Sequence, residues 1–307
     1  MEIKGILVTS LVPFENHMAN GGEKLLGNAS SIKRRPDGRV YVSGQMQRHV
    51  LFSAINRLNL SDPNHGKTFV SNGDGITNQI ELDLRADMGG FMHPSAGSYS
   101  GRRTAPLTVT PAVALNPSEV GRDLLVRIKS DNNGKEQALA TREFSQHDVM
   151  HMNFFLDISE LSISKMYQYE NEFNVATNFV KHADAEERLR RARLYLEATR
   201  YMNDYANQAR NAVSGEPEEV LIVFDNVLSR KASRYFTASE QEKKNILAEL
   251  DERQAKYFLG DDKTENSVSK AYNDAITYLT NPDNKLFDPS GNSEVRTFAQ
   301  AFPKINL

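Results

Sequence analysis

Residues 3–12 read IKGILVTSLV, and this stretch decides the fold. It is β-branched and aliphatic, interrupted by Gly5, and such a run favours a strand within a sheet. Pro13 follows, and because proline interrupts strand pairing we expect the strand to end there. The sequence therefore predicts a first, central strand around which the rest of the chain is arranged.

A loop and a helix follow this strand. Residues 16–39 read NHMANGGEKLLGNASSIKRRPDGR, and their Gly, Asn and Ser content with the closing Pro-Asp-Gly predicts a loop and a turn. After a short extended piece at 40–42, Ser43 is a good N-cap for a helix of about four turns. The predicted buried face carries Met46, Val50, Leu51, Ala54, Ile55 and Leu58, and the opposite face carries Gln45, Arg48, His49 and Asn56.

The middle of the chain predicts an insertion and a hairpin. Residues 61–103 hold many Gly, Ser and Asn with little periodicity, which is typical of an insertion carrying mobile loops. A strand is expected at 107–115. Residues 118–147 alternate on both sides of the turn DNNGKE and predict a hairpin too polar for the core, so we expect it to project. Another strand is expected at 149–158.

The last third of the chain predicts helices around one more strand. Residues 184–213 form the clearest helix, which begins with a capping-box pattern of Asp184 and Glu187. VLIVF at 220–224 predicts a buried strand, and two helices are expected near 238–257 and 265–280. This order predicts an α+β fold, with helices on one face of an antiparallel sheet of the ferredoxin-like, RNA-recognition-motif-like kind.

The composition is that of a globular protein whose overall charge does not favour nucleic acid. The 307 residues include 37 basic and 40 acidic side chains, and the net charge of -3 argues against a simple cationic nucleic-acid binder. The chain has no cysteine, which excludes disulfides, thiolate catalysis and zinc sites that need sulfur. Its first residues lack the length and flanks of a signal peptide or membrane span, so we expect a cytoplasmic protein without membrane contact.

The histidines offer only a weak case for catalysis. His147 and His151 face the same side of a predicted strand with Asp148 between them, but no third metal ligand is evident. We therefore favour a pair of edge histidines. No histidine has a nucleophile at a recognisable spacing, and GGEKLLGNAS lacks the Gly-Lys-Ser/Thr ending of a phosphate-binding loop. The sequence predicts no enzyme and no cofactor.

A local basic segment contrasts with the overall charge. Residues 23–48 contain six Lys or Arg and two acidic residues, a local charge of +4. Lys33, Arg34 and Arg35 alone would equally fit a solvated turn. Their proximity to Ser43-Gly44-Gln45 favours an anion, because free amides and the helix dipole attract negative charge and a small residue permits close approach. A phosphate is the economical candidate, with Gln45 and Arg48 on the polar face beside it.

Two further cationic points are candidates for the same role. The Gly-rich insertion ends with Ser100-Gly101-Arg102-Arg103. The predicted helix 184–213 ends with ANQARN, which brings Asn207, Gln208 and Arg210 together. Arg210 would serve equally well to complement the helix dipole.

These separated pieces resemble one family. YVSGQMQRHVLF after a Gly- and Asn-rich basic loop, MGGFM followed by RRTAPLTVTPAVAL, and ANQARN are similar to the DevR-type backbone subunit of type I CRISPR Cascade complexes, in the RAMP superfamily. The pieces lie in the expected order over roughly residues 1–225.

The resemblance implies a division into palm, fingers and thumb. Residues 1–60, 104–117 and 148–307 would form an RNA-recognition-like palm with C-terminal helices, residues 61–103 a finger insertion, and residues 118–147 a hairpin thumb. Copies would stack as a helical filament along one guide RNA, with each thumb displacing a base, and would present the guide to a target DNA strand beside other Cascade subunits. Such a protein grips phosphates and shape, because base pairing reads the sequence.

The resemblance also indicates which residues contact the guide. The loop and helix start after the first strand would contact its backbone, and Arg102 and Arg103 match the family's basic pair. The full set of expected RNA contacts is Lys33, Arg34, Arg35, Ser43, Gly44, Gln45, Arg48, Arg102, Arg103, Asn207, Gln208 and Arg210.

Two other functions remain open at this point. Type III backbone subunits of similar shape cleave RNA with an acidic residue in the loop after the first strand, where this chain offers Glu15 and Glu23 and no Asp before Asp37. A free-standing regulatory RNA-binding protein is the other alternative.

Overall fold

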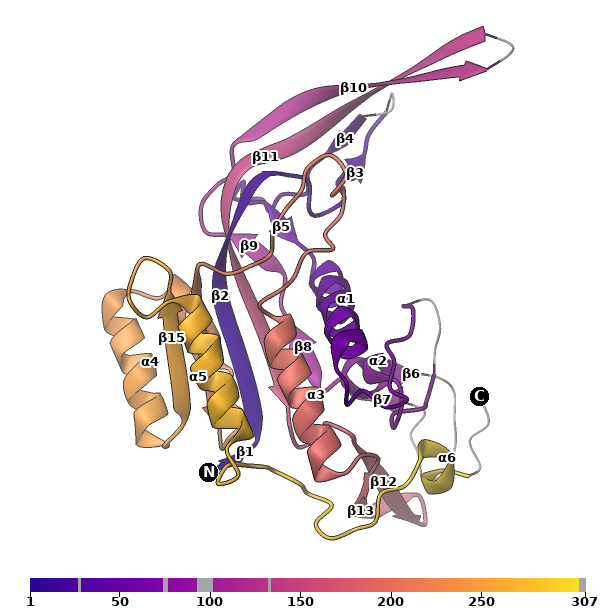
Figure 1. The fold of residues 1–307 in the computed structure, drawn as a ribbon, viewed down its shortest axis with the longest axis vertical. Helices are drawn as coiled ribbons and strands as arrows, with labels where there is room; N and C mark the ends of the chain where they lie inside the picture. The colour runs from indigo at the N-terminus through magenta and orange to yellow at the C-terminus, as the bar shows by residue number, and fades with distance from the viewer. Residues whose placement is uncertain (27–28, 74–76, 93–101, 132–133, 304–307) are drawn as a thin grey trace.

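Ten strands of the described chain form one mixed sheet at the centre of the molecule (Figure 1). The computed structural model describes residues 1–26, 29–73, 77–92, 102–131 and 134–303. Strand β2 (Gly5–His17) lies between β14 (Glu219–Asp225) and β11 (Gly134–Asp157), antiparallel to both. The predicted first strand is therefore central, and the strand predicted from VLIVF lies beside it.

The prediction that the first strand ends at Pro13 is wrong, because the strand continues to His17. The pairing of β2 explains why proline is tolerated. The carbonyl of Leu11 accepts from the amide of Glu218 on the β14 side, and backbone groups two residues apart point the same way. The missing N–H of Pro13 would therefore point past the start of β14, where no strand needs it.

The predicted hairpin extends far beyond the sheet (Figure 1). Strand β10 (Val120–Asp131) pairs with β11 from Val120↔Ser145 out to Asp131↔Gly134. The returning strand and the strand expected at 149–158 are one strand of 24 residues, because β11 passes from β10 directly onto β2, beginning at Ser145↔His17. We call β10 and the outer part of β11, residues 120–131 and 134–144, the hairpin arm.

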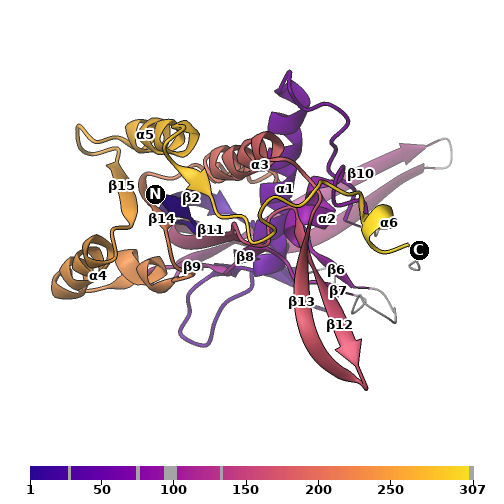
Figure 2. The same cartoon turned by 90° about the horizontal axis from the view of Figure 1, so that it is seen from below.

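Helices cover both faces of the sheet, which corrects the expectation of one face (Figure 2). On one face lie α1 (Gly44–Ser61), α3 (Ala185–Ala198) and α5 (Val268–Thr280), packed on side chains such as Ile6 and Val8. On the other face lie η1 (Lys231–Thr237) and α4 (Glu240–Glu252), packed on Leu7, Phe155 and Leu221. Consecutive residues of β2 thus serve two cores, as strand alternation requires.

The predicted helix 184–213 is wrong in its second half. Helix α3 begins with Asp184, whose side chain accepts from the amide of Glu187, and ends at Ala198. Residues 202, 205 and 213 remain buried, but they belong to a loop. Asn207 adopts a left-handed φ of 63°, and the carbonyl of Met202 accepts from the amide of Gly215 at 2.7 Å. These apolar residues at helical spacing are therefore the inward-pointing side chains of a loop and not the buried face of a helix.

Other elements differ from the expectation or were not predicted. Strands β12 (Ile163–Glu170) and β13 (Phe173–Lys181) form a second hairpin, which extends away from the helices (Figure 2). Strand β15 (Lys256–Asp261) follows α4 where a helix was expected to reach 257. The short elements are β1 (Glu2–Ile3), β3 (Glu23–Lys24), β4 (Ala29–Ser31), β5 (Tyr41–Val42), α2 (Leu84–Gly89), β6 (Phe91–Met92), β7 (Arg102–Arg103), β8 (Leu107–Val109), β9 (Ala112–Ala114), β16 (Lys285–Leu286) and α6 (Phe298–Ala301).

None of the helices in the described ranges combines the length and the apolar character that crossing a membrane would require.

Candidate nucleic-acid interface

A cleft of about 980 Å³ lies beside the first two turns of α1. Helix α1 contributes Gly44, Gln45, Arg48 and His49 to its lining. The remaining walls come from the insertion and from the strand that follows it. They consist of Ser71, Asn72, Gly73, Thr77, Asp83, Arg85, Ala86, Gly90, Phe91, Ala105, Leu107, Thr108 and Val109.

Two arginines face this cleft, and the carboxylate of Asp83 is also part of its wall. The guanidinium carbons of Arg48 and Arg85 lie 5.8 and 4.7 Å from the ring centroid of Phe52. Arg48 donates to the carbonyl of Gly89, and Arg85 donates to the carbonyl of Ser71 at 2.7 Å. Within the described part of the chain, neither forms an ion pair with a carboxylate. The cleft thus holds two half-buried arginines against one acidic side chain, Asp83.

Burial makes these charges costly in the absence of an anion. Loss of hydration lowers the pKa of Arg48, and the neighbouring Arg85 lowers it further. Burial also lowers the pKa of Arg85, against the opposing effect of Asp83. An anion bound between the two guanidinium groups would offset the lost hydration and their mutual repulsion.

The start of α1 has both a structural and a binding explanation. The Ser43 hydroxyl accepts from the amide of Met46 at 3.2 Å, which confirms the predicted N-cap. A Cβ on Gly44 would lie 3.3 Å from the carbonyl oxygen of Val109, so glycine lets the helix start pack against the end of β8. Gln45 is exposed at the cleft. The first turn of α1 thus lines the cleft, and its backbone lies close to the end of β8.

The basic segment before the helix folds as a small turn. The amide of Arg35 donates to the carbonyl of Arg39 at 2.9 Å, and the amide of Gly38 donates to the carbonyl of Arg35 at 2.9 Å. Asp37 pairs with Arg39 at 2.7 Å and neutralises it. Arg34 and Arg35 remain exposed, and Lys33 is half-buried. The turn therefore leaves Arg34 and Arg35 accessible to solvent, while Arg39 is paired within the turn.

Arg103 does not present its charge to a ligand, which corrects the prediction. Its guanidinium is buried, donates to Asp87 Oδ1 at 2.7 Å and donates to the carbonyls of Ile163 and Glu160. Gly90 permits this arrangement, because its φ is 65° and a Cβ there would lie 2.4 Å from the Arg103 carbonyl oxygen. The side chain of Arg102 lies outside the part of the chain that the structure describes.

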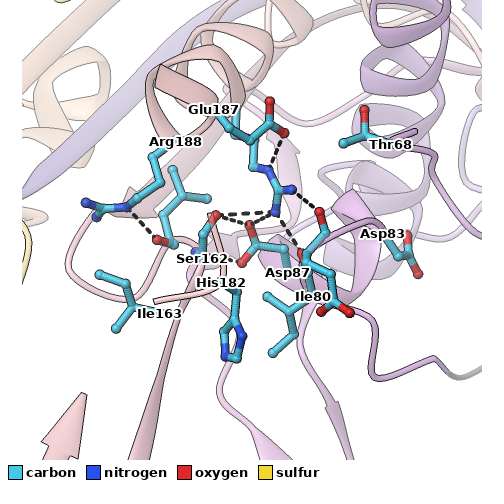
Figure 3. Close-up of polar contacts among 12 residues, drawn as sticks. Thr68, Ile80, Asp83, Asp87, Ser162, Ile163, His182, Glu187 and Arg188 are labelled. Carbon is cyan, nitrogen blue, oxygen red and sulfur yellow. Dashed lines mark hydrogen bonds and ion pairs between the residues drawn. The ribbon is translucent and has the colours of Figure 1, made fainter. Parts of the chain in front are cut away.

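Asp87 is the centre of a buried ion network (Figure 3). Its carboxylate accepts from Arg103, from Arg191 at 2.7 Å, and from both the amide and the hydroxyl of Ser162. Burial alone would raise the pKa of Asp87, but Arg191 and Arg103 hold it below its usual value. Arg191 also pairs with Glu187 at 2.7 Å. The network attaches α2 to α3 and to the turn before β12.

Asn207, Gln208 and Arg210 lie in a loop instead of at a helix end. Asn207 donates to the carbonyl of Met18 at 3.1 Å, and the Gln208 side chain accepts from the amide of Val213 at 2.9 Å. Arg210 is exposed, and no helix dipole is present there for it to complement. The loop is joined to the segment that leads from β2 to the basic turn.

Neither histidine of the predicted edge pair, His147 and His151, lines the cleft. His147 contacts Glu15 at the surface, and His151 Nε2 lies 3.1 Å from the hydroxyl of Thr9. The sequence reasoning missed the buried pair of His17 and Asp148, whose atoms lie 2.6 Å apart. In the described ranges, no group of three or more His, Asp or Glu side chains is arranged to hold a metal ion.

The sequence reasoning also missed Arg85. It lies in the predicted insertion, where the sequence shows little periodicity. The available signal was a positive residue in the first turn of a helix that Asp83 caps.

The fold belongs to a class found in CRISPR complexes. A chain from a solved "CRISPR RNA-guided surveillance complex" is similar, with a TM-score of 0.53 and 14% identity over 89% of this chain and 99% of that chain. A chain from a "CRISPR RNA-guided surveillance complex, pre-nicking" is similar, with a TM-score of 0.53 and 13% identity over 90% and 99%. No protein of curated function matches the chain. Residues 12–223 match the family described as "CRISPR-associated negative auto-regulator DevR/Csa2", and the chain belongs to this family.

Proposed function

We propose that this chain is a non-catalytic backbone subunit that binds the guide RNA of a type I CRISPR Cascade complex in the cytoplasm. The cleft carries this proposal, because it combines Gly44, Gln45 and Arg48 of the predicted contact set with Arg85. Neither arginine forms an ion pair in the described chain, and Asp83 is the one acidic residue in the cleft wall against the two of them. Family membership and the likeness in fold support it.

In this role the RNA backbone follows a path from the basic turn to the cleft. Lys33, Arg34, Arg35, Ser43, Gly44, Gln45 and Arg48 keep their proposed contacts, and Arg85 joins them. Arg102 remains a candidate and Arg103 does not. Asn207, Gln208 and Arg210 are proposed contacts near the end of β2. Cations that grip phosphates hold any guide sequence equally well, which leaves the bases for pairing with target DNA.

In the proposed assembly, three regions of the chain have different roles. Residues 1–60, 104–117 and 148–307 act as the palm, residues 61–103 as the finger insertion and residues 118–147 as the thumb. Copies of the chain line one guide as a helical filament, next to other Cascade subunits. The long arm suits a thumb that crosses an RNA strand, because it extends well past the rest of the sheet (Figure 1).

Replacing Arg34 and Arg35 together with Gln tests this function. Affinity for single-stranded RNA is expected to fall to a similar degree for all sequences, with the slope of log affinity against log salt reduced by about 1.4, since each lost phosphate contact contributes about 0.7. The matched control is Lys243→Gln with Lys244→Gln, which removes two charges from α4. A wild-type protein that purifies as nucleic-acid-free monomers and binds no RNA overturns the proposal.

The family description also names negative autoregulation, which favours a free-standing regulator as a second candidate. The size of the particle that the protein forms with RNA distinguishes the two functions. A backbone subunit forms RNA-dependent assemblies of several copies, whereas a regulator binds a defined RNA as one unit.

A further inference from the structure

A second group of charges lies at the root of the hairpin arm, apart from the residues that line the cleft. Glu143 on β11 stands directly opposite Arg122 on β10. Its carboxylate lies 3.1 Å from Arg122 Nη2 and 3.7 Å from Arg34 Nη2 of the basic turn. The Glu143 side chain is only 7% exposed, while those of Arg34 and Arg122 are 42% and 74% exposed. A buried anion thus holds two accessible cations from different elements.

The hydrogen bonds of Glu143 leave most of the arginine donors free. Oε1 accepts from Arg122 Nε at 3.2 Å, and Oε2 accepts from the amide of Ile32 at 3.3 Å. Arg34 is beyond hydrogen-bonding distance and is held by charge attraction alone. Its guanidinium donates to no other residue in the described ranges. One carboxylate between two guanidinium groups leaves a net positive charge of one.

We propose that Arg34 and Arg122 form a phosphodiester-binding site, with Glu143 as the positioning residue that holds them side by side. Both guanidinium groups approach the same carboxylate, so they lie close enough for the oxygens of one phosphate to accept from both. That the phosphate belongs to the guide RNA rests on the proposed function. Arg122 carries the contact from the basic turn onto the arm.

The face of the arm beyond this site indicates a single strand as the ligand. Alternate residues of a strand share a face, so Leu124, Val126 and Ile128 follow Arg122 outward on the same side. They are 64%, 51% and 65% exposed, and Leu139 lies opposite Val126 and is 50% exposed. An apolar face beside a cationic site suits unpaired bases next to their phosphate, whereas a duplex hides its bases.

Binding of single-stranded RNA by Arg122→Gln tests the site. Affinity is expected to fall about tenfold and the salt slope by about 0.7, because one charge-assisted phosphate contact is lost. Arg122 is largely exposed, so its replacement leaves the fold intact. The matched control is Arg193→Gln, which removes an exposed guanidinium paired with Glu197 on α3. Double-stranded RNA of the same length is expected to bind more weakly than the single strand.

The variant Glu143→Gln distinguishes a role of Glu143 in positioning the two arginines from the direct effect of its negative charge on the attraction of RNA. Loss of a negative charge would by itself strengthen RNA binding. Positioning predicts the reverse, a loss of affinity of about fivefold, because Arg34 is no longer held beside Arg122. It also predicts that Glu143→Gln with Arg122→Gln binds little worse than Arg122→Gln alone. Glu143→Asp, which keeps the charge, is expected to recover part of the affinity.

Different outcomes overturn the site and the proposed function. If the wild type binds RNA and the Arg34 and Arg35 double variant is weakened, but Arg122→Gln binds like the wild type or Glu143→Gln binds more tightly, this site is wrong and the function stands. If the wild type binds no RNA, the proposed function itself fails.

Discussion

Asp87 is the residue on which the insertion depends most. It is fully buried, and its carboxylate pairs with both Arg191 and Arg103. Removing one member of a buried ion network leaves the other charges without compensation. The network therefore favours one placement of α2 over alternatives in which these arginines would be buried alone.

Asp87→Asn is expected to lower the free energy of unfolding by about 3–5 kcal/mol, because the buried Arg103 loses its carboxylate partner and the buried Arg191 keeps only its pair with Glu187. Urea unfolding followed by circular dichroism measures this change. Asp204→Asn is the control, since Asp204 pairs with Arg57 at the surface and its loss is expected to cost under about 1 kcal/mol. Equal effects of the two substitutions would contradict the central role of Asp87.

His182 makes the fold sensitive to mild acid. Its Nδ1 donates to the carbonyl of Arg296 at 2.7 Å, and its Nε2 therefore accepts from the Ser164 hydroxyl at 2.9 Å, which requires a neutral ring. Burial first, and then the charge of Arg103, lowers the pKa of His182 to about 4.

The unfolded chain binds a proton on His182 below its ordinary pKa of 6.5, and the folded chain does so only near 4. The free energy of unfolding is therefore expected to fall as the pH drops from 6.5 to about 4. The fall is on the order of 3 kcal/mol, since one pKa unit corresponds to about 1.36 kcal/mol. Urea unfolding between pH 7.5 and 4.5 measures it. His182→Gln should flatten the profile, whereas the surface variant His147→Gln should not. An unchanged profile in His182→Gln would count against this assignment.

Single residues were predictable where the local sequence decides their role. Ser43 acts as an N-cap, and Arg48 reaches the polar side of its helix, because both follow from helix geometry within one or two turns. Arg103 was misassigned because its partner Asp87 is 16 residues away, in a segment without periodicity. Arg85 was overlooked for the same reason. Burial of a charge depends on a partner that spacing alone does not reveal.

At the scale of elements, the central strands and the first helix were predictable. The runs at β2 and β14 are aliphatic because both faces of these strands are covered. The hairpin β12–β13 was missed although Phe173, Val175 and Phe179 alternate with polar or small residues in β13. Many of its side chains are exposed, so it does not form a buried apolar run like β2 or β14. The end of α3 was missed because loop residues such as Tyr205 point inward at helical spacing.

The outer part of the hairpin arm is expected to be dispensable for folding and to contribute to RNA binding. Residues 126–139 can be replaced by Asn-Gly, since Leu125 and Ala140 are paired and this dipeptide favours a tight hairpin turn. The melting temperature should change by only a few degrees, because the removed side chains that are described lie outside the core. RNA affinity, measured by fluorescence anisotropy, should fall.

The control for this truncation is the same change in the other hairpin. Joining Lys165 and Phe179, which are paired, through Asn-Gly shortens β12–β13 by a similar length. RNA affinity should then stay at the wild-type level. If both truncations weaken binding equally, the arm has no particular role.

At the scale of the whole molecule, the proposed filament predicts how mass depends on RNA length. Head-to-tail contacts do not close into a ring, so doubling the length of the RNA should about double the number of bound copies. Mass photometry on RNAs of graded length measures this number. The Arg34 and Arg35 double variant is the control. A mass that stays constant for all lengths would contradict a filament.

The arm has one consequence for the life of the protein in the cell. In the described chain, β10 pairs only with β11, so its outer backbone edge is open beside the exposed Leu124, Val126 and Ile128. Open edges with apolar side chains recruit other strands and promote aggregation. A newly made copy that finds no guide is therefore expected to be cleared by proteolysis, so that the supply of RNA sets the abundance of the subunit. Pulse-chase labelling with and without guide transcription would measure this, and equal lifetimes would refute it.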